Sequence, residues 1–166
     1  PSYVVYNFSD SKFNGYCGTS DNQVLEAIEG LNGFGKFGAQ NRKYEYTHTK
    51  LDGTTEKINF TRGLKGGRGA VDNACLYFNP FPGYSKCKVT VVYYNEENDL
   101  DRGQRRVQYL GQLDDSGKLV TKVTGDADPS TFLAFSAEFD DLSKPIYTWG
   151  GGANKTVMGM IVEYEK

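Results

Sequence analysis

The chain has 166 residues, a length that suits one folded domain and leaves little room for a second. Its 19 basic and 21 acidic residues give a formal net charge of −2, which excludes a global positive field able to hold nucleic acid or an anionic membrane. No apolar run approaches the roughly 20 residues of a membrane span, and the first residues lack a signal-peptide pattern. We therefore expect one domain, residues 1–166, without a nucleic-acid or membrane partner.

Short stretches that alternate apolar and polar residues run through most of the chain. The 12 Tyr, 10 Phe and 20 Gly favour strands joined by tight turns, and turn signals recur about every 8 to 12 residues. The pattern predicts an all-β fold, an antiparallel β-sandwich of jelly-roll type with about ten strands. The predicted strands cover residues 2–8, 43–49, 56–60, 75–78, 88–94, 105–111, 118–124, 131–139, 145–149 and 157–165.

One segment early in the chain favours a helix instead. Residues 20–30 read "SDNQVLEAIEG", in which Ser20 or Asp21 supplies an N-cap and Gly30 a C-terminal stop. The predicted helix is too short to change the fold class.

The three cysteines are too few for a disulfide scaffold and too scattered for a zinc site. Cys75 and Cys87 lie six positions on either side of Phe81, at the centre of the turn-like "NPFPGYS". A hairpin centred there would make them a cross-strand pair, a geometry that permits a disulfide. Two small buried thiols are the equal alternative.

The stretch "LKGGRGA", residues 64–70, fails the phosphate-binding pattern GxxxxGK[ST], because it leads into a β-rich segment rather than a helix. It is either a surface loop or a cationic site. Glycines beside Lys65 and Arg68 let the backbone approach a ligand while two cations point the same way. A polymer that carries carboxylates would match such an arrangement.

Catalytic patterns are weak. The one histidine, His48, alternates with Tyr44 and Tyr46 on one face of a predicted strand, which is typical of a structural residue. "GDADPS" and "NDLD" offer oxygen atoms to a structural calcium, but neither completes an EF-hand loop. We therefore predict no catalytic residue and no cofactor, with a structural calcium as the alternative.

Trp149 is the only tryptophan and directly precedes "GGGANK". An indole beside a glycine-rich loop can stack on a sugar ring, and a core or rim position is the alternative.

Several motifs between residues 43 and 166 resemble one family in their order along the chain. They include "LKGGRG", "YFNPFPG", "KVTVVYY" and "RRVQYLG", followed by "YTWGGGANKTVMGMIVEYE". Together they are similar to the non-catalytic β-sandwich modules attached to bacterial pectate lyases. Within that group the chain most resembles the pectin-binding carbohydrate-binding module family 77.

The resemblance implies an extracellular, monomeric module that binds demethylated homogalacturonan through basic side chains and is covalently linked to a catalytic module. Lys65 is the best match to a ligand lysine, and Lys50 is the next. Arg62, Arg68 and Lys155 are candidates because they lie near the glycine-rich loops.

Three other functions stay open at this stage. The first is a module that binds neutral β-glucan or xylan by stacking on Trp149 and surface tyrosines. The second is a small polysaccharide lyase with Arg or Lys as its base. The third is a structural or adhesive domain without a sugar ligand, because fold does not fix function.

Overall fold

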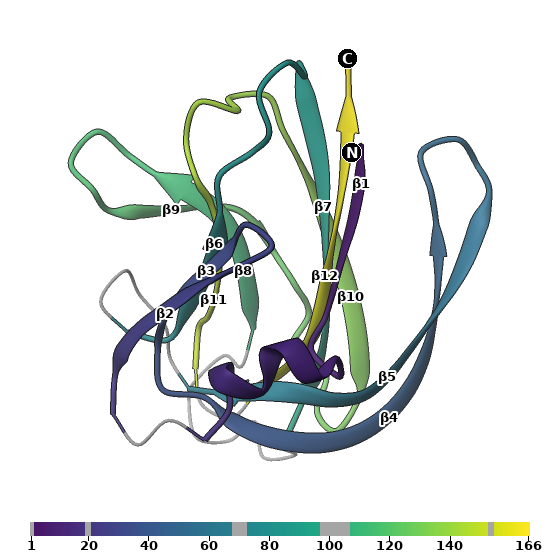
Figure 1. Cartoon of the computed structure of the whole chain (residues 1–166), viewed down its shortest axis with the longest axis vertical. Helices are drawn as coiled ribbons and strands as arrows, with labels where there is room; N and C mark the ends of the chain where they lie inside the picture. The colour runs from purple at the N-terminus through teal and green to yellow at the C-terminus, as the bar shows by residue number, and fades with distance from the viewer. Residues whose placement is uncertain (1, 19–20, 68–72, 97–106, 153–154) are drawn as a thin grey trace.

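The computed structural model describes residues 2–18, 21–67, 73–96, 107–152 and 155–166. Two antiparallel sheets face each other across one core (Figure 1). The antiparallel β-sandwich of jelly-roll type is therefore confirmed. The ten predicted strands are present, and the described residues form twelve strands in total.

Sheet A has the strand order β10-β7-β12-β5-β4, and β1 pairs with β12. Its strands are β1 (Tyr3–Asn7), β4 (Gly38–Thr49), β5 (Thr55–Gly66), β7 (Lys86–Asn95), β10 (Phe132–Phe139) and β12 (Lys155–Glu165). Sheet B has the order β2-β3-β6-β11-β8-β9. Its strands are β2 (Gln23–Ile28), β3 (Leu31–Gly35), β6 (Cys75–Phe78), β8 (Gln108–Leu113), β9 (Leu119–Thr124) and β11 (Ile146–Gly150).

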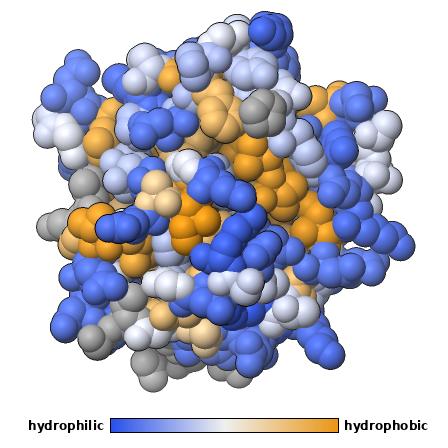
Figure 2. Space-filling model, in the orientation of Figure 1, coloured by the Kyte–Doolittle hydropathy of each residue, from blue (hydrophilic) through white to orange (hydrophobic). Residues whose placement is uncertain are grey.

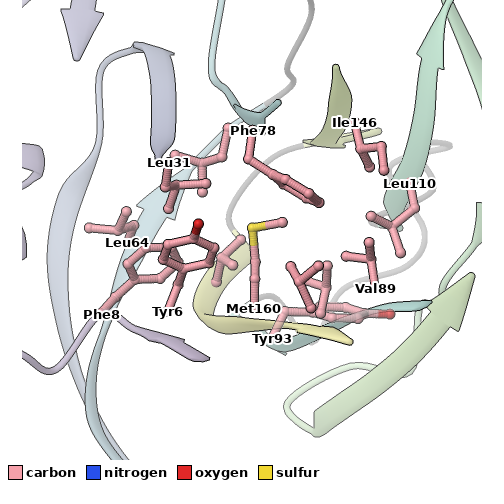
Figure 3. Packing of buried hydrophobic residues seen from close by; sticks show 14 of the residues in the cluster. Tyr6, Phe8, Leu31, Leu64, Phe78, Val89, Tyr93, Leu110, Ile146 and Met160 are labelled. Atoms are coloured by element: carbon pink, nitrogen blue, oxygen red, sulfur yellow. The ribbon is translucent and has the colours of Figure 1, made fainter. Parts of the chain in front are cut away.

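The main core lies between the sheets and takes residues from one side of most strands. Figure 3 shows side chains of both sheets pointing toward one another, with Met160 of β12 among them. On β7, for example, Val89, Val91 and Tyr93 enter this core while the residues between them point the other way. Apolar residues also reach the surface in separate groups among hydrophilic ones (Figure 2).

The β4–β5 hairpin is longer than predicted and strongly curved. Near one end β5 pairs with β12, and from there the hairpin bends away and runs up beside sheet A (Figure 1). Its apolar side packs on the outer face of sheet A in a second cluster that includes Tyr46, Ile58 and Phe60. We call residues 44–60 the arm. Sheet A is thus covered on both faces, which explains why ten of the eleven residues of β12 are buried.

The helix predicted over residues 20–30 is wrong, because β2 and β3 form a hairpin there. Glu29 and Gly30 have positive φ values of 50° and 87°, which fits a tight two-residue hairpin turn. Only Leu25 of β2 is fully buried, so one side of this edge strand enters the core and the other meets solvent. A short 3-10 helix, η1 (Ser11–Tyr16), lies just before this hairpin and was not predicted.

The hairpin predicted around Phe81 is also wrong. β6 belongs to sheet B and β7 to sheet A, so the turn-like segment crosses from one sheet to the other. Cys75 and Cys87 consequently occupy different sheets, and both are free and buried. Within the described part of the chain, a helix with the length and apolar character of a membrane span is absent.

Candidate functional site

Aromatic side chains gather on the outer face of sheet B, which points away from the main core. Trp149 of β11 pairs in register with Cys75 of β6 and with Tyr109 of β8, and Phe34 of β3 continues this row. In the next row Tyr147 of β11 pairs with Tyr77 of β6. We call this surface the aromatic face, and its members are Phe34, Tyr77, Tyr109, Tyr147 and Trp149.

The rings of the aromatic face contact one another in pairs. The centroids of Tyr77 and Tyr147 lie 4.8 Å apart at an interplanar angle of 24°, and those of Tyr109 and Trp149 lie 5.4 Å apart at 35°. Trp149 and Tyr147 are buried, whereas Tyr77, Tyr109 and Phe34 are half-buried. Burial raises the pKa of the Tyr147 phenol. A ligand would therefore meet the half-buried rings first.

A glycine lets the strands approach closely beside Trp149. A Cβ atom on Gly111 of β8 would overlap the Val120 carbonyl oxygen and lie 2.9 Å from Cη2 of the Trp149 ring. A side chain at this position would push β9 or the indole aside. The absence of a side chain at Gly111 therefore leaves the space that β9 and the Trp149 ring occupy.

Buried hydrogen bonds join β8 to β11 beneath the aromatic face. Gln108 donates from Nε2 to Thr148 Oγ1 at 2.9 Å, and Thr148 donates from Oγ1 to the Tyr109 carbonyl oxygen at 2.8 Å. These polar groups are satisfied inside the protein, so they hold the two strands in register rather than face a ligand.

The predicted lysines do not form one patch. Lys50 lies at the tip of the arm, where its Nζ is 3.6 Å from a Glu56 carboxylate oxygen and 4.5 Å from the centre of the Tyr3 ring. Lys65 lies at the opposite end of the same hairpin, where it pairs with Gly38. About 30 Å of strand separates the two ends. The prediction of one docking surface shared by Lys50 and Lys65 is therefore wrong.

Lys155 also differs from the prediction. It is only 2% exposed, and its Nζ donates to the Gly152 carbonyl oxygen at 2.8 Å. The prediction that it presents its ammonium group to a polymer at the surface is therefore wrong. Arg68 lies outside the described residues.

Arg62 is half-buried and makes three hydrogen bonds to neutral oxygen atoms around η1. It donates from Nε to the Phe8 carbonyl oxygen at 2.8 Å, from Nη1 to Asn14 Oδ1 at 2.5 Å, and from Nη2 to the Asp10 carbonyl oxygen at 2.9 Å. The guanidinium group thus ties β5 to the N-terminal segment, a role that the sequence did not indicate.

His48 is buried in an internal pair rather than exposed at the surface. It is 2% exposed, and its Nε2 is 2.6 Å from Oε1 of Glu163, which is 4% exposed. This pair joins the arm to β12. Among the described residues, no group of three or more His, Cys, Asp or Glu side chains is placed to hold a metal ion. "NDLD" lies outside those residues, and in "GDADPS" the Ala127 carbonyl oxygen accepts from Asn95 Nδ2 at 3.1 Å.

Tyr77, Tyr109, Tyr147 and Phe34 were not predicted as site residues. A signal for three of them was present, because "CLYF", "QYLG" and "IYTW" place aromatic residues where alternation calls for a polar, solvent-facing side. Phe34 carried no such signal, since its strand was not predicted.

Comparisons with solved structures agree on the fold. No protein-family model matches the chain, and no curated protein matches it. A Clostridium thermocellum xylanase 10B structure of CBM22-1 and GH10 modules, complexed with xylohexaose, is similar with a TM-score of 0.50 and 11% identity. This match covers 98% of the chain but 28% of the xylanase structure. The chain shares the β-sandwich fold of a carbohydrate-binding module.

Two further structures have lower scores. The CBM22-1 xylan-binding domain of Paenibacillus barcinonensis Xyn10C has a TM-score of 0.48 at 7% identity, with coverage of 98% of this chain and 94% of that one. The K2 cleaved adhesin domain of Lys-gingipain has a TM-score of 0.49 at 8% identity, with 99% coverage of both chains.

Proposed function

We propose that the chain is a non-catalytic carbohydrate-binding module and that the aromatic face is its binding surface. The observation that carries the proposal is the alignment of five aromatic side chains across four adjacent strands on one side of sheet B. Among the described residues, every hydrophobic member of this cluster belongs to a strand of sheet B.

Aromatic rings on a flat sheet suit a polysaccharide for a simple reason. One side of a pyranose ring presents C–H groups, which pack against an aromatic ring, while the hydroxyl groups stay in water. The half-buried Tyr77 and Tyr109 each combine a ring with a hydroxyl, so they can stack on a sugar and also form a hydrogen bond. Strands hold these rings at fixed positions, which lowers the entropy cost of binding.

The geometry favours a neutral β-linked polysaccharide, such as xylan or β-glucan, over demethylated homogalacturonan as the main ligand. Recognition of homogalacturonan along its chain needs cations at regular intervals on one surface. Lys50 and Lys65 lie at opposite ends of the β4–β5 hairpin, and Lys155 is buried. The CBM22 structures named above, one described as xylan-binding and one complexed with xylohexaose, are consistent with this choice.

The proposal includes an extracellular location and covalent linkage to a catalytic module. Binding through a few stacked rings is weak, and a tether to an enzyme raises the effective concentration of the module at a repeating polymer. The chain's one histidine is held in the buried pair with Glu163, which leaves it unable to serve as a base for a substrate at the surface.

Affinity gel electrophoresis against xylan, mixed-linkage β-glucan, polygalacturonate and highly methyl-esterified pectin tests the proposal. We expect retardation by a neutral polymer, reduced about tenfold in affinity by Tyr77→Ala or Tyr109→Ala, because one stacked ring contributes roughly 1.4 kcal/mol. The matched control is Tyr84→Ala, a half-buried tyrosine outside the aromatic face that packs on Tyr164.

Three outcomes would contradict the proposal. The first is a loss of affinity in Tyr84→Ala equal to that in Tyr77→Ala or Tyr109→Ala. The second is retardation by polygalacturonate alone, and the third is release of unsaturated products from a polymer by the purified chain. The last result would favour a lyase. Folding of each variant is checked by its circular dichroism spectrum and unfolding midpoint.

A further inference from the structure

A hollow on strands β4 and β5 of sheet A is lined by three basic residues. It lies where the pairing of β4 and β5 changes register between Asn41 and Tyr44, so that Arg42 and Lys43 fall within the irregularity. Its volume is about 590 Å³. We call it the basic hollow, and its lining residues are Ser9, Asn41, Arg42, Lys43, Thr61 and Arg62.

The lining has an excess of positive charge. None of its residues is acidic, and the nearest described counter-ion is Glu96, which accepts two hydrogen bonds from Arg42 Nε and one from Arg42 Nη2. Lys43 is exposed and forms no ion pair with a described residue. Among the described residues, one glutamate thus offsets one of the three cations, and these residues together carry a net charge of about +2.

Arg62 gives the hollow a fixed donor. Its three hydrogen bonds go to neutral oxygen atoms, and no described carboxylate lies within ion-pair distance of it. A guanidinium group has five N–H donors, so two remain for a ligand. Because its other bonds hold it in place, little side-chain entropy is lost when an anion binds.

The remaining lining groups suit a sugar. Asn41 and Thr61 are exposed and present an amide and a hydroxyl beside the cations. Ser9 Oγ instead accepts from the backbone N–H groups of Thr61 and Arg62 at 2.8 and 3.2 Å, and so fixes the floor of the hollow. The site therefore joins paired donors for an anion to neutral hydrogen-bonding groups.

We propose that the basic hollow is a second saccharide site, which binds the carboxylate of a uronate unit through Arg62 and Lys43. This inference rests on the proposed function of carbohydrate binding, but it does not require that the aromatic face is the main binding surface. The ligand is an acidic oligosaccharide or a uronate side group on a polymer whose backbone is neutral. Arg62 was predicted as a ligand residue, whereas Arg42 and Lys43 were not.

The test is calorimetric titration of the full chain with trigalacturonate at low salt, with xylotriose as the neutral probe. Lys43→Glu is expected to weaken trigalacturonate binding about tenfold and to leave xylotriose binding unchanged, because it places a like charge beside the carboxylate. The matched control is Lys57→Glu, which makes the same change of charge on the same hairpin at a side chain that is 70% exposed. The control is expected to alter affinity less than about twofold.

Equal effects of Lys43→Glu and Lys57→Glu would overturn the inference, because they would show a response to net charge alone. Tighter binding of a sulfated trisaccharide than of trigalacturonate would overturn the assignment to a carboxylate. Arg62→Lys keeps the charge but loses the paired donors, and we expect about a fivefold loss if the variant keeps its fold by circular dichroism. Loss of xylotriose binding through Tyr77→Ala with trigalacturonate binding intact would separate the two sites.

Discussion

The outer faces of the two sheets differ in what covers them. On sheet A, the outer cluster of Val92, Met158 and Ile161 is closed by the arm, which supplies Ile58 and Phe60. On sheet B, the hydrophobic cluster has no described member from outside the sheet. The apolar side chains on the outer face of sheet A therefore form a second core. Those on the outer face of sheet B form a candidate ligand surface.

Polar contacts at the tip reinforce closure of the arm. Glu163 of β12 contacts His48 Nε2 through Oε1 and accepts from the Leu51 N–H at 2.8 Å through Oε2. Tyr3 of β1 donates to Glu56 of β5 at 2.7 Å. The arm is therefore fastened to both β1 and β12, and its opposite side carries exposed pairs such as Lys57 and Glu45.

The largest expected effect comes from opening the arm. Glu163→Ala leaves the buried His48 without its partner and also removes the acceptor of the Leu51 N–H, and we expect the free energy of unfolding to fall by about 3 kcal/mol. Urea unfolding measures the change. Glu165→Ala, on the same strand but with its carboxylate 3.7 Å from Lys86 near the surface, should cost less than about 0.5 kcal/mol. Similar losses in the two variants would show that the arm is not fastened by Glu163.

A smaller effect is expected beneath the aromatic face. Gly111→Ala forces its new methyl group against Val120 and Trp149, and we expect a loss of about 2 kcal/mol together with a shift of the Trp149 fluorescence. Gly15→Ala is the control, because no atom lies within 4 Å of its added Cβ. An unchanged emission spectrum in Gly111→Ala would contradict the packing described for the indole.

Alkaline pH is expected to weaken the main core. Burial raises the pKa of Tyr6, Tyr16 and Tyr164 to about 12, from an ordinary value of 10.0. The unfolded chain loses these protons at lower pH than the folded one, so their contribution is complete below about pH 10 and is lost as the pH rises toward 12. Urea midpoints should fall steadily across that interval, and a flat profile would show that these phenols ionise in the folded protein.

The smallest effect is expected for salt on binding to a neutral polymer. Contacts between sugar rings and aromatic rings are not screened, so raising NaCl from about 50 to about 500 mM should change the affinity for xylan less than about twofold. Retardation in xylan gels at both concentrations measures it. A steep decline would indicate that cations, rather than the aromatic face, bind the polymer.

Local pattern was enough to predict the ten strands and the sandwich, because apolar alternation and turn residues are encoded within a few positions. It failed for residues 20–30, where Leu, Glu and Ala are good helix formers and the positive φ values of Glu29 and Gly30 are not visible in sequence. Tertiary pairing decides the outcome there, because β2 pairs with β3 and β3 in turn pairs with β6.

The candidate site was harder to predict because it depends on which strands become neighbours. Trp149 was singled out, but Tyr77 lies 72 positions away in the sequence and reaches the same face only through the pairing of β6 with β11. The same reasoning explains the basic residues. Lys50 and Lys65 are 15 positions apart in the sequence, but the extended strand β5 lies between them and places them at opposite ends of the β4–β5 hairpin.

The central claim is that the aromatic face of sheet B, and not the outer face of sheet A under the arm, binds the neutral polysaccharide. Trp149 is the only tryptophan, so its fluorescence reports on the aromatic face alone. Titration with xylohexaose should change this emission and reduce quenching by acrylamide, while amide signals of the arm stay in place in NMR spectra. Binding of xylohexaose with an unchanged Trp149 signal and shifted arm resonances would contradict the account.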